Sequence, residues 1–209
     1  MYVHPAKAGT VSLVGDLMLR DRLVNHRKED DKGLDAAIAA LRECEVVTAN
    51  LEMPLSRRGS KILKHSNLRS DPEVIEDVAA MGIHAVTLAN NHMMDYGPDA
   101  LHDTLTACDD AGILRCGAGR SLGEALAPAW LETGGKRIAF ISVSSTLPLG
   151  SEATEGTTGI APIRIGFSLD IDTNLINEQP GTMPVVHTWT RAEDQEMVCS
   201  HVRNLAAQA

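Results

Sequence analysis

The first half of the chain alternates between short apolar runs and segments whose apolar residues recur with helical spacing. Four runs predict buried strands, at residues 10–14, 45–49, 83–88 and 113–116. Three segments between them predict helices, at residues 35–43, 73–81 and 98–111. Strands and helices that alternate at this length predict right-handed crossovers and a mostly parallel sheet, so the fold class is α/β.

Proline and glycine mark the ends of two of these helices. Asp71 is placed to cap the helix over 73–81 with Pro72 at its first position, and Gly82 ends it. Pro98 opens the next helix, and Gly112 stops it. The boundaries therefore agree with the apolar spacing.

The pattern changes in the second half. Gly134 and Gly135 predict a hairpin that feeds a further core strand over 136–143. Residues 144–185 are rich in Gly, Thr, Pro and Ser, and they predict a site-covering loop rather than a second domain. Residues 191–207 predict a closing helix.

Composition narrows the class of protein. The 209 residues suit a single α/β domain, and 44% hydrophobic with 22% charged residues is typical of a globular chain. The formal net charge of -9, without a dense Lys/Arg block, argues against nucleic-acid binding. A local basic segment comprises Arg57, Arg58, Lys61, Lys64 and Arg69. It could hold an anionic group or be a solvated loop.

Compartment signals agree with one another. Cys44, Cys108, Cys116 and Cys199 lack C-x-x-C spacing and predict free buried thiols in a reducing compartment. The N-terminus shows no leader pattern, and no apolar run is long enough to span a membrane. We therefore expect a soluble, cytoplasmic chain without a membrane segment.

Polar clusters directly follow the first three predicted strands. They are Asp16; Asn50 with Glu52; and Asn91-His92 with Asp95. Singly, a helix cap, a turn or a hydrogen-bonded loop histidine explains each cluster. Parallel connectivity would bring all three to one sheet edge, where ligands of α/β proteins collect. Because Asn oxygens and imidazole bind divalent metals and imidazole transfers protons near pH 7, the pattern predicts a metal-dependent hydrolytic site.

These motifs make the chain resemble a known family, the bacterial capsule-synthesis proteins of the CapA/PgsA type, which are associated with poly-γ-glutamate. The family lies in the calcineurin-like metallophosphatase superfamily. The resemblance covers about residues 10 to 145 and is carried by residues 15–19, 50–55, 68–72, 89–97, 111–113 and 117–119. The most specific element is Ala-Asn-Asn-His-x-x-Asp-x-Gly at 89–97.

The resemblance implies a metallophosphatase-like layered α/β sandwich with a divalent-metal site at the strand ends. Position by position, it makes Asp16 a metal ligand and places Asn50 and Glu52 in the second metal-binding motif. Asn91 then matches the superfamily's Asn ligand, and His92 matches its proton-donating or transition-state-stabilising histidine. The metal identity stays open among Mn, Fe, Zn and Mg.

Two further residues have alternative roles. Asp95 is expected either to orient His92 or to cap the helix near Pro98, and we favour orientation as a catalytic role. Arg69 is a candidate for binding a substrate anion through its bidentate guanidinium, although an exposed loop arginine has the same sequence signature.

The chain departs from the pattern at two places. Met18 stands where many metallophosphatases have a histidine, although the capsule family itself commonly has an apolar residue there. The family also continues into a strand that ends in His-Trp-Gly and into later histidine elements. We therefore expect the family domain to extend beyond Ala209, metal binding by these 209 residues to be weak, and His187-Thr188-Trp189 to be a chance match.

Three functional hypotheses remain. The first is a divalent-metal-dependent hydrolase of a phosphoester or a γ-glutamyl amide, acting on a small molecule or an anionic polymer. The second is a non-catalytic scaffold or accessory component that works with capsule-synthesis subunits. The third is an inactive truncated fragment.

Overall fold

The structure is a computed structural model and describes residues 7–26 and 31–209. The expectation about an N-terminal leader concerns mainly residues 1–6, which lie outside the described residues.

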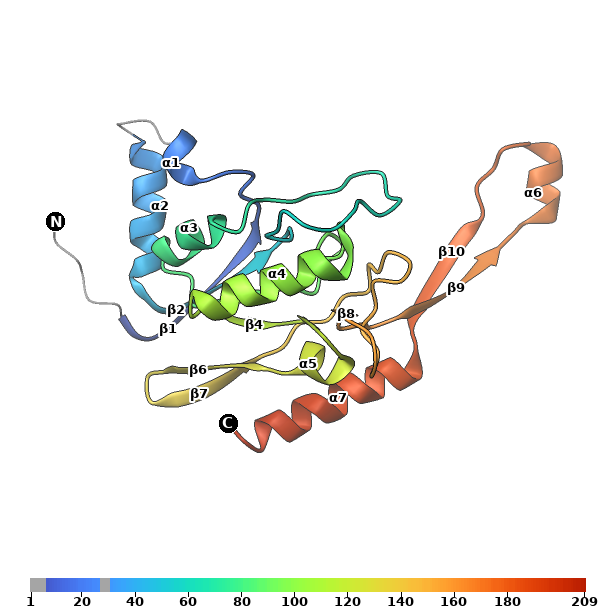
Figure 1. Cartoon of the computed structure of the whole chain (residues 1–209). Coiled ribbons are helices and arrows are strands. Elements are labelled where there is room, and N and C mark those ends of the chain that lie inside the picture. Colours follow the sequence, from blue (N-terminus) through green and yellow to red (C-terminus); the bar gives the residue numbers. More distant parts are fainter. Residues whose placement is uncertain (1–6, 27–30) are drawn as a thin grey trace.

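Four parallel strands form the central sheet in the order β1-β2-β3-β4 (Figure 1). Their bounds are β1 (Lys7–Leu17), β2 (Cys44–Leu51), β3 (Ala85–Thr87) and β4 (Leu114–Cys116). Every neighbouring pair is parallel, which confirms the predicted α/β class. The architecture is consistent with a metallophosphatase-like fold.

Helices in the connections cover one face of this sheet (Figure 1). They are α1 (Leu23–His26), α2 (Lys32–Arg42), α3 (Val74–Ala80) and α4 (Gly97–Asp110). The largest core cluster packs Val47 of β2 against Val78 of α3 and Leu101 of α4, all without exposed surface. Burial of these apolar side chains is the main force that holds the helices on the sheet.

Three of the predicted helix ends are present, but the start predicted at Asp71 and Pro72 is wrong: α3 begins at Val74, and its N-cap residue, Glu73, makes no capping hydrogen bond through its side chain. Pro98 lies in the first turn of α4. Gly82 and Gly112 follow the helices with positive φ angles of 84° and 69°, a conformation that favours glycine.

A hairpin covers the other face of the sheet. Its strands, β6 (Ala129–Thr133) and β7 (Lys136–Phe140), pair antiparallel around Gly134 and Gly135. Ala129 packs on Ala85 and Cys116, which point away from the helical face. The predicted hairpin is therefore present, but β7 pairs with β6 in a separate two-stranded sheet. The closing helix α7 (Ala192–Ala206) was also predicted and lies near this layer (Figure 1).

The prediction of a site-covering loop over residues 144–185 is wrong. The segment contains β8 (Gly159–Ile160), which pairs with β5 (Ala118–Gly119) just before α5 (Leu122–Leu126). It also contains β9 (Ile165–Asp170) and α6 (Thr173–Glu178), and β9 pairs antiparallel with β10 (Val185–Thr190). This hairpin projects away from the sheet (Figure 1). Its apolar side chains are exposed, so burial did not produce the pattern that identifies a core strand.

The four cysteines are free. Cys108 and Cys116 are buried as expected, and burial raises the pKa of the Cys108 thiol to about 12 and that of Cys116 to about 11. Cys44 and Cys199 are only half-buried. Within the described part of the chain, no helix combines the length and apolarity that a membrane crossing requires.

The packing of α4 predicts a large effect of a core truncation. Leu101→Ala removes a side chain with 0% exposure and leaves a cavity, so we expect the free energy of unfolding to fall by about 2–5 kcal/mol in urea denaturation. Val202→Ala on α7 is the matched control, because Val202 is 47% exposed. Equal losses in the two variants would contradict the proposed core.

Candidate functional site

The strand register brings the first two polar clusters together. Asp16 of β1 is the register partner of Asn50 of β2, and Asn50 is in turn the partner of Thr87 of β3. Because these strands are parallel, their polar residues meet at one edge of the sheet, as the sequence predicted.

The Asn50 side chain links two carboxylates. Its Nδ2 donates to Asp16 Oδ1 at 2.8 Å and to Glu52 Oε2 at 2.6 Å. Its Oδ1 accepts hydrogen bonds from Thr87 Oγ1 at 3.2 Å and Asn90 Nδ2 at 3.1 Å. All of the polar atoms of this carboxamide are therefore used within the cluster.

Asn90 fixes which way the Asn50 amide faces. Asn90 Oδ1 accepts from the backbone N–H groups of His92 and Met93, each at 3.0 Å, and Asn90 Nδ2 also donates to Leu51 O at 2.8 Å. Reversing the Asn90 amide would break these bonds, so its nitrogen faces Asn50 Oδ1. Asn50 consequently presents its NH₂ group to Asp16 and Glu52.

Sequence reasoning selected Asn91 and missed Asn90. In the structure the Asn91 backbone oxygen accepts from Lys64 Nζ at 2.5 Å, whereas its side chain makes no hydrogen bond with any described residue. Adjacent asparagines in a loop look alike in sequence. Only the contact with Leu51 of the neighbouring strand identifies Asn90 as the residue that joins the clusters.

The environment of Glu52 disfavours the ionised form of its carboxyl group. Its side chain is 12% exposed, and its backbone N–H donates to Leu17 O at 3.2 Å. Burial, followed by the nearby negative charge of Asp16, raises the pKa of the Glu52 carboxyl above its ordinary value. A positive charge at this position would favour the ionised form of the Glu52 carboxyl.

His92 and Asp95 form a close pair. His92 Nδ1 lies 2.6 Å from Asp95 Oδ2, and the Asp95 side chain is 0% exposed. A carboxylate oxygen accepts hydrogen bonds, so this contact assigns the ring proton to Nδ1, and the Nδ1–H group donates a hydrogen bond to Asp95. The other ring nitrogen, Nε2, faces Glu52 and lies 3.9 Å from Glu52 Oε1. Asp95 therefore stands where it can orient His92.

Lys64 completes the surroundings of Asp95, and sequence reasoning did not assign it to the site. Its Nζ donates to Asp95 Oδ1 at 2.7 Å and lies 3.1 Å from His92 Nδ1. The backbone N–H of Leu68 donates to Asp95 Oδ2 at 2.7 Å. The only sequence signal was membership of the basic segment, which does not reveal the partner of any one lysine.

Most of the basic segment is committed to ion pairs. Arg57 pairs with Asp71 at 2.9 Å and with Glu73 at 2.8 Å, and Arg58 pairs with Asp103. These contacts neutralise charges that the sequence left available for an anionic ligand.

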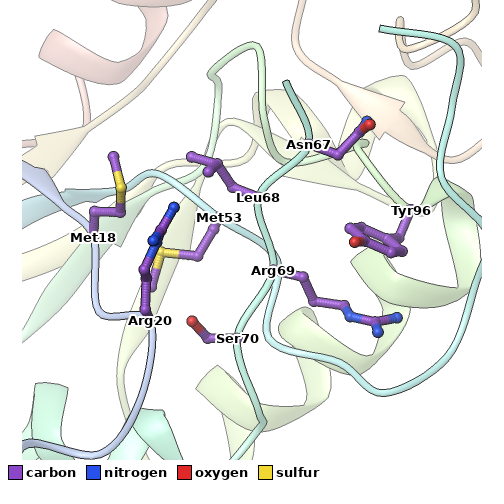
Figure 2. Close-up of a pocket in the computed structure, with 8 residues that line it drawn as sticks. All are labelled: Met18, Arg20, Met53, Asn67, Leu68, Arg69, Ser70 and Tyr96. Carbon is purple, nitrogen blue, oxygen red and sulfur yellow. The ribbon is translucent and has the colours of Figure 1, made fainter. Parts of the chain in front are cut away.

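Arg69 lines a pocket of about 340 Å³ beside this cluster (Figure 2). Its guanidinium stacks over the Tyr96 ring at 4.1 Å from the centroid and does not contact Asp16, Glu52 or His92 by any hydrogen bond. The pocket is lined by Met18, Arg20, Met53, Asn67, Leu68, Arg69, Ser70 and Tyr96.

No group of three or more His, Cys, Asp or Glu side chains arranged to hold a metal ion occurs within residues 7–26 and 31–209.

The raised pKa of Glu52 predicts how stability changes with pH. The folded state holds the Glu52 proton more tightly than the unfolded state, so this group lowers the free energy of unfolding as pH rises above about 4.5, its ordinary value. Glu52→Gln removes that contribution. We therefore expect the stability of the variant relative to wild type to increase between pH 4 and pH 7 in urea denaturation. The exposed Glu155→Gln is the control, and a difference independent of pH for Glu52→Gln would be contrary to this prediction.

The chain is similar to several curated proteins. It is 30% identical over 165 residues to the uncharacterized protein y4sH of Sinorhizobium fredii, a match that covers 76% of this chain and 35% of that relative. It is 26% identical over 156 residues to the capsule biosynthesis protein CapA of Bacillus anthracis, with 72% and 38% covered. It is 28% identical over 160 residues to the PGA biosynthesis protein CapA of Bacillus subtilis, with 73% and 42% covered.

The matches therefore span less than half the length of these relatives. The family model described as bacterial capsule synthesis protein PGA_cap matches residues 10–204, which is nearly the whole chain. With the parallel sheet and the strand-end cluster in place, this match shows that the chain belongs to the bacterial capsule synthesis protein family PGA_cap.

Proposed function

We propose that this protein acts in capsule or poly-γ-glutamate metabolism as a divalent-metal-dependent hydrolase. The single observation that carries the proposal is the convergence of the Asp16 and Glu52 carboxylates on the Asn50 amide, with His92 Nε2 3.9 Å from Glu52 Oε1. Relatives named for capsule and PGA biosynthesis support the biological setting.

The chemistry of the donor groups supports a divalent cation as the proposed cofactor. The carboxylates of Asp16 and Glu52 both accept hydrogen bonds from Asn50 Nδ2. The raised pKa of Glu52 reflects burial together with repulsion from Asp16. Hard divalent ions prefer such oxygen ligands. Asp16 and Glu52 would hold the ion, and Asn91 remains a proposed ligand. Asn50, which the family resemblance placed in the metal-binding set, would instead fix the positions of the two carboxylates, because its NH₂ group faces them. A bound ion would supply electrophilic activation of the bond to be hydrolysed.

His92 would handle the proton. Its Nδ1–H is committed to Asp95, so the imidazole can take up and release a proton only at Nε2, on the side of Glu52. In hydrolysis the oxygen of one water would form the new bond to the phosphorus or carbonyl carbon, Nε2 would take up the proton that this water loses, and Nε2 would pass that proton to the leaving group as the scissile bond breaks. Asp95 and Lys64 would keep the ring in this orientation throughout.

The substrate is proposed to be an anionic small molecule or polymer, with Arg69 as a binding residue. The scissile bond would be a phosphoester or a γ-glutamyl amide. Both reactions need the same elements of the site, namely an electrophilic centre and a proton donor at Nε2.

This proposal predicts a strong dependence on His92. After removal of metal with EDTA and addition of Mn²⁺, Zn²⁺ or Mg²⁺, the protein should hydrolyse p-nitrophenyl phosphate or γ-glutamyl-p-nitroanilide. In His92→Ala we expect the rate to fall by about 10²–10⁴-fold, because proton transfer at Nε2 is lost. The rate of product release is followed by absorbance.

His187→Ala is the control, because His187 is exposed on β10. It should keep the wild-type rate. A His92→Ala variant as active as wild type would remove this residue from the mechanism, and activity unaffected by EDTA would refute the metal requirement.

A second candidate function is that of a non-catalytic component of polymer assembly. Two relatives in Mycobacterium tuberculosis, 29% identical over 152 residues, are named probable polyglutamine synthesis accessory proteins, which favours this reading. The exposed apolar residues of β9 and β10 offer a surface for another subunit. Co-purification with membrane synthase subunits, without turnover of either test substrate, would favour this function over hydrolysis.

A further inference from the structure

The pocket beside the carboxylate cluster contains a second guanidinium that the sequence motifs did not single out. Arg20 follows β1 and lines the pocket together with Arg69 (Figure 2). Figure 2 shows the Arg20 side chain between Met18 and Met53, whereas Arg69 extends beneath Tyr96. In this view the two arginine side chains lie on opposite sides of the segment that carries Leu68 and Ser70.

The two arginines differ in how many contacts their guanidinium groups make within the protein. Arg69 stacks on the Tyr96 ring, and its Nη1 donates to Arg58 O at 3.4 Å. Arg20 has no hydrogen bond or ion pair with any residue in the described ranges 7–26 and 31–209, although the chain carries 28 acidic residues against 19 basic ones. By contrast, the nearby Arg22 forms ion pairs with both Glu76 and Asp77.

The other polar groups of the pocket are mostly used within the protein. Asn67 Nδ2 donates to Ile62 O and Asp95 O, each at 3.3 Å, and Ser70 Oγ donates to Leu19 O. Met18, Met53 and Leu68 supply apolar surface. A ligand that enters the pocket would therefore contact the free N–H donors of the Arg20 guanidinium and the apolar side chains of the lining.

The pocket is joined to the proposed hydrolytic site through shared residues. Leu68 lines the pocket and donates its backbone N–H to Asp95. Met53 directly follows Glu52, and Tyr96 directly follows Asp95. The pocket is therefore bordered by the chain segments that also carry Glu52 and Asp95.

We propose that this pocket binds an oxyanion group of the substrate, a carboxylate or a phosphate, with Arg20 as its principal receptor and Arg69 as the second cation. The inference rests on the proposed function only for calling the ligand a substrate. A guanidinium matches either oxyanion with two parallel hydrogen bonds, and the methionine and leucine side chains accommodate the adjoining apolar part of the ligand. The volume of about 340 Å³ far exceeds the ~30 Å³ share of one water, so the pocket admits more than a bare ion.

The acidic surface makes this arrangement selective. With a net charge of -9, the protein as a whole repels anions, and a pocket that contains two guanidiniums is a local exception. An anionic group would be held there in preference to the rest of the surface.

The test measures binding to the 209-residue protein by NMR titration in EDTA at constant ionic strength. The probes are butyrate, its neutral isostere butyramide, and inorganic phosphate. We expect butyrate or phosphate to bind with shifts at the pocket residues and butyramide to bind at least about ten-fold more weakly, since a charge-assisted pair contributes about one such factor. The two anions distinguish a carboxylate from a phosphate ligand.

Arg20→Met should raise the Kd of the bound anion about ten-fold, and Arg20→Lys should restore part of the affinity by retaining the charge. Arg203→Met on α7 is matched in charge and should leave the Kd unchanged, because Arg203 is exposed and pairs with Glu196 outside the pocket. Thermal unfolding verifies that each variant is folded. Binding of neither anion, equal binding of butyramide, or an unchanged Kd in Arg20→Met would overturn the proposal.

Because these measurements involve neither metal nor turnover, their failure would leave the hydrolysis result untouched. Conversely, absence of hydrolysis with intact, Arg20-dependent anion binding would remove the proposed reaction and retain the binding pocket.

Discussion

A carboxylate with no exposed surface must be compensated by donors within the protein, and Asp95 imposes that constraint here. Lys64 Nζ, the Leu68 N–H and His92 Nδ1 all point to its two oxygens. Removing one partner of such a buried group is costly, whereas the complete set is stable. The same contacts tie the segment that carries Lys64 and Leu68 to the strand-end loop.

The position of His92 follows from this arrangement. Asp95 fixes the Nδ1 side of the ring, so the Nε2 side faces Glu52. Asn90 also holds the loop that carries His92, because its side chain accepts from two backbone N–H groups of that loop and donates to Leu51 O of β2. Catalytic groups need such preorganised supports, because small displacements of a reacting group weaken catalysis strongly.

The regular helices and strands could be predicted from the sequence because an element that buries one face carries apolar residues at regular intervals. The four strands of the sheet and helices α3 and α4 follow this rule. The β9–β10 hairpin does not, because Phe167 and Trp189 are exposed there and backbone pairing rather than burial defines the strands. Where side chains are not buried in a core, the spacing of apolar residues gives little information about secondary structure.

The site shows a similar division between what could and could not be predicted. Asp16, Asn50 and Glu52 were brought together by parallel topology alone. Lys64, Asn90 and Arg20 could not be identified in this way, because their roles depend on which side chains lie across from them in space. Arg57 and Arg58 make the converse point, since their charges suggested a ligand and are instead paired with acidic side chains.

The tautomer of the His92 imidazole shows whether Asp95 orients this ring. Nitrogen-15 NMR of histidine-labelled protein, with His92→Gln to assign the signal, reports which ring nitrogen carries the proton. We expect a protonated Nδ1 and a bare Nε2, with this preference lost in Asp95→Asn. A bare Nδ1 with a protonated Nε2, unchanged in Asp95→Asn, would contradict it.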